Sequence, residues 1–192
     1  MPWLCLVVAM LHAFLLFMSV LVDDVKKMPT ARFAAIIARM LTYDTSLPGR
    51  AGASIDIAVL YRSGDAESTS EASDTAAMIR TLTKNGIGSL QVKTYSLAFA
   101  DAAKLDRDAM SYGIDVFIVA DALAEQIAAI KQVSTRRKIT SIGRSSAQVR
   151  RGLAVALYQL DGKSKILVNL EVSKREGAAF SSDLLRLCEV IQ

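Results

Sequence analysis

The residues best suited to chemistry in this chain are short polar clusters that follow apolar, strand-like runs. These clusters are Arg62-Ser63-Gly64-Asp65, Ala120-Asp121 and Gly143-Arg144-Ser145-Ser146. In open parallel sheets, ligands bind at the carboxyl ends of the strands, where these clusters are expected to lie. We therefore predict a ligand crevice at that edge, with the candidate residues Ser63, Asp65, Asp121, Arg144 and Ser145.

The cluster Gly143-Arg144-Ser145-Ser146 has a composition that suits an anion. Backbone N–H groups at the start of a short helix and an arginine guanidinium can together bind a phosphate or a carboxylate. The same residues also fit a helix cap followed by a solvated arginine. The sequence leaves both interpretations open.

The histidine and cysteine content excludes several kinds of catalytic and metal site. The only histidine, His12, and one of the two cysteines, Cys5, lie in an apolar N-terminal run. If that run is cleaved or embedded in a membrane, the folded domain has no histidine for a Ser-His-Asp triad, a Cys-His pair or a zinc site. Cys188 alone cannot form an internal disulfide or a paired-cysteine metal clip. We therefore expect no catalytic residues, no metal and no cofactor.

Charge is unevenly distributed along the chain, although the net charge is only +4. Between Gln126 and Leu160 seven residues are basic and none is acidic, whereas residues 64–74 contain four acids and no base. A one-sided field steers association with a partner of opposite charge, although a solvated basic rim explains the pattern equally well. The basic residues lack the interleaved aromatics of a nucleic-acid site, so we expect no nucleic acid. The predicted partner contacts are Arg136, Arg137, Arg144, Arg150 and Arg151.

The N-terminal run from Trp3 to Val22 contains no charged residue. A helix of that length spans the hydrocarbon core of a bilayer. A signal peptide normally has a positive N-terminal region and a small-residue cleavage site, and neither is evident here. Residues 1–27 are therefore predicted to be either a signal peptide or a retained membrane anchor, followed by one domain over residues 28–192. Met28 is an alternative start that would make the protein cytoplasmic.

Apolar periodicity predicts alternating helices and strands along the rest of the chain. Strands connected through helices run parallel with right-handed crossovers. The predicted fold class is α/β, with a single doubly wound, mostly parallel sheet flanked by helices. A C-terminal antiparallel hairpin and a final packing helix complete it. The predicted helices are 30–43, 71–85, 98–112 and 121–133, and the predicted strands are 55–61, 90–95, 114–120, 138–142, 154–160 and 166–170.

The segment from Ser164 to Gln192 predicts a strand, a short helix that ends at Gly177, and a second helix. Ser181 or Ser182 can cap the second helix by accepting from its free backbone N–H groups. The spacing i, i+3, i+4, i+7 predicts that one face of this helix is buried. That face comprises Leu184, Leu187, Cys188 and Ile191.

This segment resembles the C-terminal signature of the YfiR-like family. The resemblance lies in a strand ending in Asn169, a helix ending at Gly177, and the motif Phe-Ser-Ser-x-Leu-Leu-Arg-Leu-x-x-Val over residues 180–190. The family consists of small secreted bacterial α/β proteins, and its best-known member is a periplasmic repressor of a membrane-bound diguanylate cyclase. Many members carry cysteine pairs, which this chain lacks, so redox behaviour is not carried over.

The resemblance implies a non-enzymatic regulator that binds and restrains a membrane signalling protein, such as a diguanylate cyclase or a sensor kinase. It also implies a location in the periplasm, secreted or tethered to the inner membrane, with a homodimer as an open alternative. A second hypothesis is a solute-binding module, because the doubly wound pattern resembles one lobe of a periplasmic binding protein. An enzyme is the weakest hypothesis, because no spacing indicates catalytic carboxylates, lysine or serine–lysine chemistry.

Overall fold

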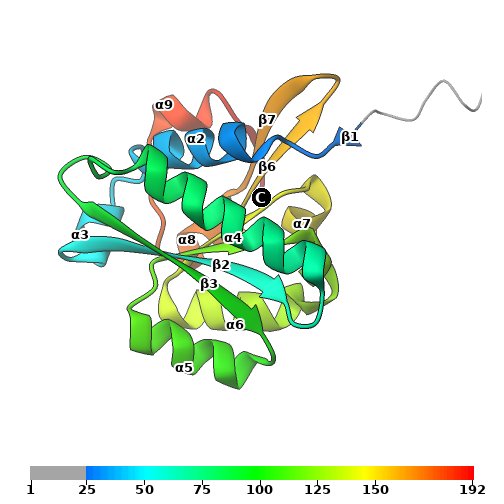
Figure 1. The fold of residues 1–192 in the computed structure, drawn as a ribbon. Coiled ribbons are helices and arrows are strands. Elements are labelled where there is room, and N and C mark those ends of the chain that lie inside the picture. Colours follow the sequence, from blue (N-terminus) through cyan, green and yellow to red (C-terminus); the bar gives the residue numbers. More distant parts are fainter. Residues whose placement is uncertain (1–24) are drawn as a thin grey trace, which may run out of the picture.

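The computed structural model describes residues 25–192, which form one mixed sheet with helices on both faces (Figure 1). The predicted signal peptide or anchor, with His12 and Cys5, lies outside these residues. Among the described helices, none has the length and apolar character needed to cross a membrane.

The sheet has the strand order β3-β2-β4-β5-β6-β7-β8, and β1 pairs with β6 beside this series. The pairs from β3 to β6, and the pair β7–β8, are parallel, whereas β6–β7 and β1–β6 are antiparallel. The predicted fold class is therefore confirmed. The strands are β1 (Val25–Lys26), β2 (Ser54–Arg62), β3 (Gln91–Phe99), β4 (Val116–Val119), β5 (Thr140–Gly143), β6 (Val155–Leu160), β7 (Lys163–Asn169) and β8 (Glu189–Ile191).

The helices divide into two layers because the central strands are apolar on both faces. In β2, Ile57 and Val59 face one hydrophobic cluster, and Ala58 and Leu60 face the other. The first cluster is covered by α2 (Thr30–Leu41), α4 (Ala66–Leu82) and α9 (Ser182–Leu185), and the second by α5 (Ala102–Tyr112), η1 (Asp121–Gln126) and α6 (Ile127–Arg137). Shorter helices are α3 (Leu47–Ala51), α7 (Ser146–Arg150) and α8 (Leu170–Arg175).

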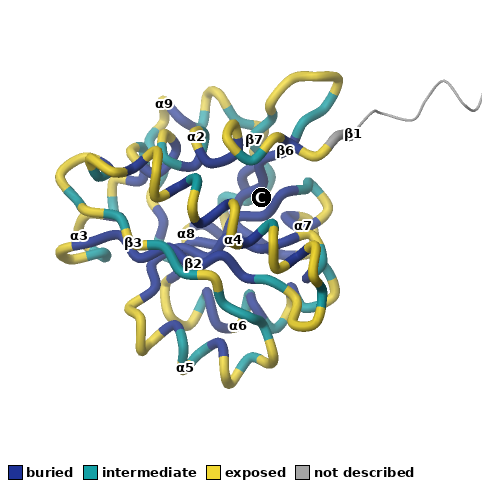
Figure 2. The backbone as a smooth tube through the Cα atoms, in the orientation of Figure 1, coloured by how far each residue is buried: buried dark blue, intermediate teal, exposed yellow. Residues whose placement is uncertain are grey.

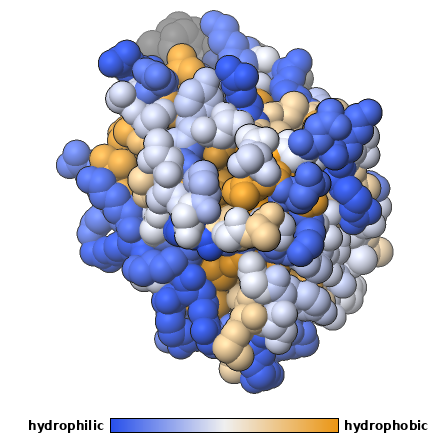
Figure 3. All heavy atoms as spheres, turned by 90° about the vertical axis from the view of Figure 1, so that its left-hand side faces the viewer, coloured by the Kyte–Doolittle hydropathy of each residue, from blue (hydrophilic) through white to orange (hydrophobic). Residues whose placement is uncertain are grey.

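Burial follows this layering. Figure 2 shows buried residues along the central strands and exposed residues in the outer turns of the helices. On the face drawn in Figure 3, hydrophilic side chains surround separate hydrophobic areas. The surface that this view shows is therefore mostly polar, as expected for a domain whose apolar residues are buried in two layers.

Three predicted helix starts differ from the structure. The helix predicted over 98–112 begins at Ala102, because β3 continues to Phe99 and Asp101 caps the helix by accepting from the Lys104 backbone N–H at 2.7 Å. The helix predicted over 71–85 begins at Ala66, because the side chain of Asp65 caps it by accepting from the Ser68 backbone N–H at 2.9 Å. Asp121 was predicted to cap a helix directly, but it is the first residue of the 3₁₀ turn η1, and α6 begins only at Ile127.

The final helix is much shorter than predicted. Ser181 caps α9, accepting from the Leu184 N–H, but the helix ends at Leu185 and the chain enters β8 beside β7. Leu184 is buried, whereas Leu187 is 73% exposed. The predicted buried face is therefore wrong at Leu187, because an i, i+3 spacing over so few residues does not separate a helix from a turn and a strand.

Candidate functional site

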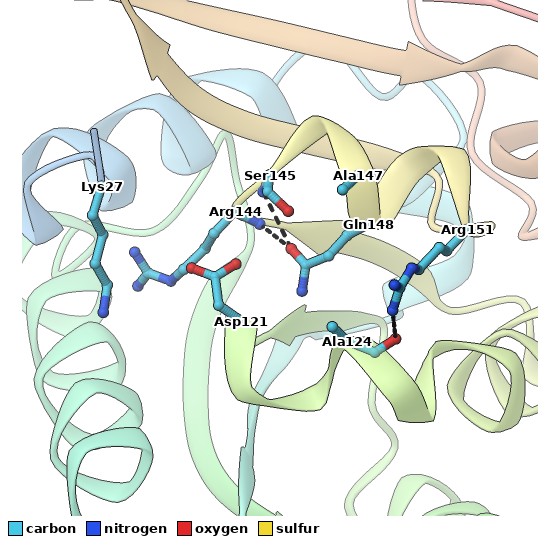
Figure 4. A pocket seen from close by; sticks show the side chains of 8 residues that line it. All are labelled: Lys27, Asp121, Ala124, Arg144, Ser145, Ala147, Gln148 and Arg151. Carbon is cyan, nitrogen blue, oxygen red and sulfur yellow. Dashed lines mark hydrogen bonds between the residues drawn. The ribbon is translucent and has the colours of Figure 1, made fainter. Parts of the chain in front are cut away.

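A crevice of about 410 Å³ lies where β4 and β5 end, at the edge of the sheet that the sequence predicted. Three of the predicted crevice residues, Asp121, Arg144 and Ser145, line it together (Figure 4). The other lining residues are Lys27, Ala124, Ala147, Gln148 and Arg151. The sequence did not predict Lys27 or Gln148, because their approach depends on tertiary packing.

The remaining two predicted crevice residues, Ser63 and Asp65, are not among the lining residues. Ser63 is exposed in the turn after β2, and Asp65 is the cap of α4. Both follow a strand, as predicted, but the sheet order places β4 between β2 and β5. The end of β2 is therefore one strand further from the crevice than the end of β4.

Arg144 is buried and already paired within the chain. Its Nε lies 3.0 Å from Glu71 Oε1 in an ion pair that lacks hydrogen-bond alignment, and its Nη2 donates to Thr75 Oγ1 at 2.7 Å. The guanidinium carbon lies 3.9 Å from the centre of the Phe33 ring, a cation–π distance. Burial lowers the pKa of Arg144, and the carboxylate of Glu71 opposes that change. Arg144 is therefore largely enclosed within the domain and exposes only a small part of its surface, at the crevice.

Glu71 also binds a second cation from a distant part of the chain. Lys27 Nζ donates to Glu71 Oε2 at 2.8 Å, so one carboxylate bridges Lys27 and Arg144. Asp121 lies opposite, with its carboxylate directed towards Arg144 (Figure 4). Partial burial raises the pKa of Asp121, and Arg144 counteracts this rise. The charges of the crevice are thus largely balanced before any ligand binds.

The backbone N–H groups that were candidates for binding an anion are occupied. Gln148 Oε1 accepts from the N–H of Arg144 at 2.7 Å and from that of Ser145 at 3.2 Å. Ser145 and Gln148 form a capping box at the start of α7. Gln148 Nε2 in turn donates to the carbonyl of Ala120 at 3.2 Å. The structure thus favours the helix-cap interpretation of this cluster, together with a buried arginine.

Most of the predicted partner contacts also have acidic neighbours. Arg136 and Arg137 both pair with Asp106 of α5, at 2.8 and 2.7 Å. The hydrogen bond from Arg137 holds the pKa of Asp106 far below its ordinary value. Arg151 pairs with Glu125 at 2.7 Å. Arg150 is exposed, and no ion pair joins it to a carboxylate within residues 25–192.

A buried carboxylate connects the C-terminal signature to the sheet. Glu176, which follows α8, is fully buried and accepts from Ser134 Oγ at 2.5 Å. It also accepts from the Ser141 N–H at 2.7 Å and the Ser141 Oγ at 2.8 Å. Burial raises the pKa of Glu176 to about 7, against these hydrogen bonds. The side chain thus joins the signature segment to α6 and β5, a structural role that the sequence did not reveal.

The sequence also missed an apolar groove of about 390 Å³ between α2, β7 and α9. A signal was present, because the apolar arc of α2 extends beyond its buried residues to Ile36. The predicted burial of Leu187 concealed the groove. Its lining residues are Arg32, Ala35, Ile36, Arg39, Met40, Tyr43, Ile166, Leu184 and Leu187.

The one free cysteine among the described residues, Cys188, has no activated thiol. Burial raises the pKa of the Cys188 thiol to about 11, which leaves almost no thiolate at neutral pH. Across residues 25–192, no three or more His, Cys, Asp and Glu side chains are grouped to hold a metal ion.

The strand order and the crevice at the carboxyl edge define a doubly wound α/β domain. Within this class, the chain belongs to the YfiR/HmsC-like family, whose model matches residues 31–189. The match extends over nearly the whole described domain. It therefore confirms the resemblance that the C-terminal motif indicated. No curated protein sequence matches the chain significantly.

Several solved structures share the fold at low sequence identity. A conserved domain protein from Vibrio cholerae O1 biovar El Tor strain N16961 has a TM-score of 0.55 and 14% identity, over 85% of this chain and 60% of that chain. The ABC domain from Streptococcus pneumonia in complex with L-Trp has a TM-score of 0.54 and 14% identity, over 79% and 60%.

A third structure, the substrate-binding protein CD0873 from Clostridium difficile, has a TM-score of 0.51 and 15% identity, over 77% of this chain and 57% of that chain. This chain thus spans about 60% of the length of these proteins. At such identities the likeness shows the fold alone.

Proposed function

We propose that this protein is a non-enzymatic periplasmic regulator that binds and restrains a membrane signalling protein of the diguanylate cyclase or sensor kinase type. The observation that carries the proposal is membership of the YfiR/HmsC-like family over residues 31–189. Two observations support the non-enzymatic part of the proposal. The charged residues of the crevice are paired within the chain, and the raised pKa of the one described thiol keeps it protonated.

Restraint of this kind operates through a shift in the partner's conformational equilibrium. A regulator shifts a two-state partner only by as much as its affinity differs between the two states. The surface of this protein that contacts the partner must therefore recognise a feature of the partner's inactive state. Of the predicted contacts, Arg136, Arg137, Arg150 and Arg151 are exposed and remain proposed members of that surface, whereas Arg144 is buried.

The test is a crosslinked pull-down from native membranes with the full-length chain tagged at Gln192, followed by an activity assay of the recovered protein. We expect a membrane cyclase or kinase whose activity falls when the purified chain is added. Recovery of soluble cytoplasmic proteins alone would contradict both export and the regulatory function.

A second candidate function is a solute-binding module, favoured by the crevice at the carboxyl edge of the sheet. Its volume of about 410 Å³ suits a small molecule, and Lys27, Asp121 and Arg151 offer charges of both signs. A rise in melting temperature with an added solute, abolished by Asp121→Ala, would support this function. A melting temperature unchanged across a solute panel would count against it.

A further inference from the structure

The groove between α2, β7 and α9 is an apolar surface whose borders are basic. Its floor is formed by Ile36 and Met40 of α2, Ile166 of β7 and Leu184 of α9. Leu187 stands at one side with 73% of its surface exposed. The groove thus combines a partly buried floor with a fully accessible leucine.

The apolar surface continues onto the edge strand. Val190 of β8 pairs with Val168 of β7, and paired residues of adjacent strands point to the same face of a sheet. Ile166 lies two residues before Val168 and therefore on that face as well. Val190 is 42% exposed. Leu187 and Val190 together extend the apolar floor of the groove towards the end of the chain.

Two arginines form the basic border. Arg32 and Arg39 are seven residues apart on α2, which is about two helical turns, so both lie on the groove side. The guanidinium of Arg39 donates to the Tyr43 hydroxyl at 3.3 Å and lies 5.6 Å from the centre of its ring. In the part of the chain that the structure describes, no carboxylate forms an ion pair with Arg32 or Arg39.

The charge pattern indicates what kind of occupant fits. A guanidinium beside an apolar floor forms its strongest interaction with a carboxylate of the same molecule that covers the floor, because the covered site excludes water. A two-fold pairing of this groove with itself would face one lining that contains Arg32 and Arg39 and no acidic residue with another of the same charge, which like-charge repulsion disfavours. The groove therefore suits a different chain that carries apolar and acidic side chains.

We propose that this groove docks an amphipathic helix of the regulated partner, with leucine-like side chains on the floor and carboxylates opposite Arg32 and Arg39. This is helix-in-groove recognition, in which apolar residues at i, i+3, i+4 and i+7 provide the anchors. The inference rests on the proposed regulatory function and assigns its contact surface. It places the main contact on α2, α9 and β8, and the exposed arginines that follow Gln126 then contribute only peripheral contacts.

The test uses two synthetic helical peptides that share one leucine stripe and differ only in carrying glutamate or lysine beside it. Binding to the full-length chain in neutral detergent is measured by fluorescence anisotropy, with detergent alone as the blank. We expect the glutamate peptide to bind at least roughly tenfold more tightly than the lysine peptide. Its binding is also expected to shift the methyl NMR signals of Ile36, Ile166 and Leu187.

Matched variants locate the contact. The double substitution Arg32→Glu and Arg39→Glu is expected to reverse the peptide preference, and Leu187→Asp to weaken the glutamate peptide roughly tenfold. Arg150→Glu, an exposed charge reversal outside the groove, is expected to change neither affinity. All these positions are exposed, and thermal unfolding of each variant checks that the fold is kept.

Equal affinity for the two peptides, no binding of either, or shifts confined to the crevice near Asp121 would overturn the proposal. The proposal would also be overturned if the chain alone formed a dimer that Leu187→Asp dissociates. The same holds if the chain bound anionic vesicles through Arg32 and Arg39 but did not distinguish the two peptides. If the peptides fail while the membrane pull-down recovers a regulated cyclase or kinase, only the groove assignment is wrong. If the peptides bind as expected but no signalling protein is recovered, the function is wrong.

Discussion

Two basic regions of this protein differ in what balances their charge. Around the crevice and along α6, the arginines are paired with acids of the same chain, at Glu71, Asp106 and Glu125. Along the groove, Arg32 and Arg39 border apolar residues, and no described carboxylate pairs with them. The richest basic stretch in the sequence is therefore largely paired within the chain, whereas two isolated arginines border an apolar groove.

The largest effect on stability is expected where a paired charge is buried. Replacing Arg144 by Met leaves the carboxylate of Glu71 beside Thr75 without its nearest buried cation. Breaking a buried pair in this way costs about 3–5 kcal/mol. We expect a loss of about 3 kcal/mol in the free energy of unfolding, measured with urea. A loss below about 1 kcal/mol, within the range of surface ion pairs, would show that Arg144 behaves like a surface residue.

The second effect concerns the pH dependence of stability through Glu176. Its pKa is raised to about 7 in the folded protein, above its value of 4.5 when unfolded. The protonated carboxyl therefore favours the folded state at low pH, and this contribution is lost as the pH rises from about 4.5 to 7. The difference amounts to about 3 kcal/mol.

Glu176→Gln should remove most of this dependence because the side chain no longer ionises. Urea unfolding of both proteins at pH 5, 6 and 7 measures this pH dependence. The free energy of unfolding of the wild type should fall relative to that of the variant as the pH increases. Parallel curves for the two proteins would show that Glu176 has no raised pKa in the folded state.

A third comparison separates the two leucines of the C-terminal motif. Leu184 is buried on the groove floor and Leu187 is exposed at its side. Replacing a buried leucine by alanine costs about 2–5 kcal/mol, so Leu184→Ala should destabilise the protein by about 2 kcal/mol. Leu187→Ala should change stability by less than about 0.5 kcal/mol. Similar losses of stability for the two variants would indicate that Leu187 is also buried, as in the longer helix that the sequence predicted.

The smallest effect is expected on the outer surface of α6. Arg137 pairs with Asp106, but both are accessible to solvent, which screens the interaction. Arg137→Gln should reduce stability by much less than Arg144→Met or Leu184→Ala, and the loss should vanish in high salt. Arg150→Gln is the matched control without a described ion pair. A loss for Arg137→Gln that persists in high salt would indicate a buried pair instead.

The sequence predicted the fold well because periodicity is a local signal. The apolar runs at β2 and β4 and the spacing of the helices were sufficient to predict a doubly wound sheet. The C-terminal motif likewise indicated the family, because its residues are nearly contiguous along the chain. Local signals failed at element boundaries, such as the start of α4, and at short elements, such as the single turn of α9 before β8.

The candidate site was less predictable because it depends on contacts between distant residues. Arg144 and Ser145 do reach the crevice with Asp121, as the strand ends predicted. The pairing of Arg144 with Glu71, and the occupation of its backbone N–H by Gln148, require positions that no spacing in the sequence reveals. The groove requires three separate elements, α2, β7 and α9, and therefore has no motif of its own.

The most direct test of the account is photo-crosslinking in native membranes from two positions of the full-length chain. One chain carries a photoreactive amino acid in place of Leu187 in the groove, and the other in place of Ala147 at the crevice; both residues are exposed. The account predicts an adduct with a membrane cyclase or sensor kinase from position 187 and none from position 147. An adduct with such a protein from position 147 alone, or only self-adducts from position 187, would contradict it.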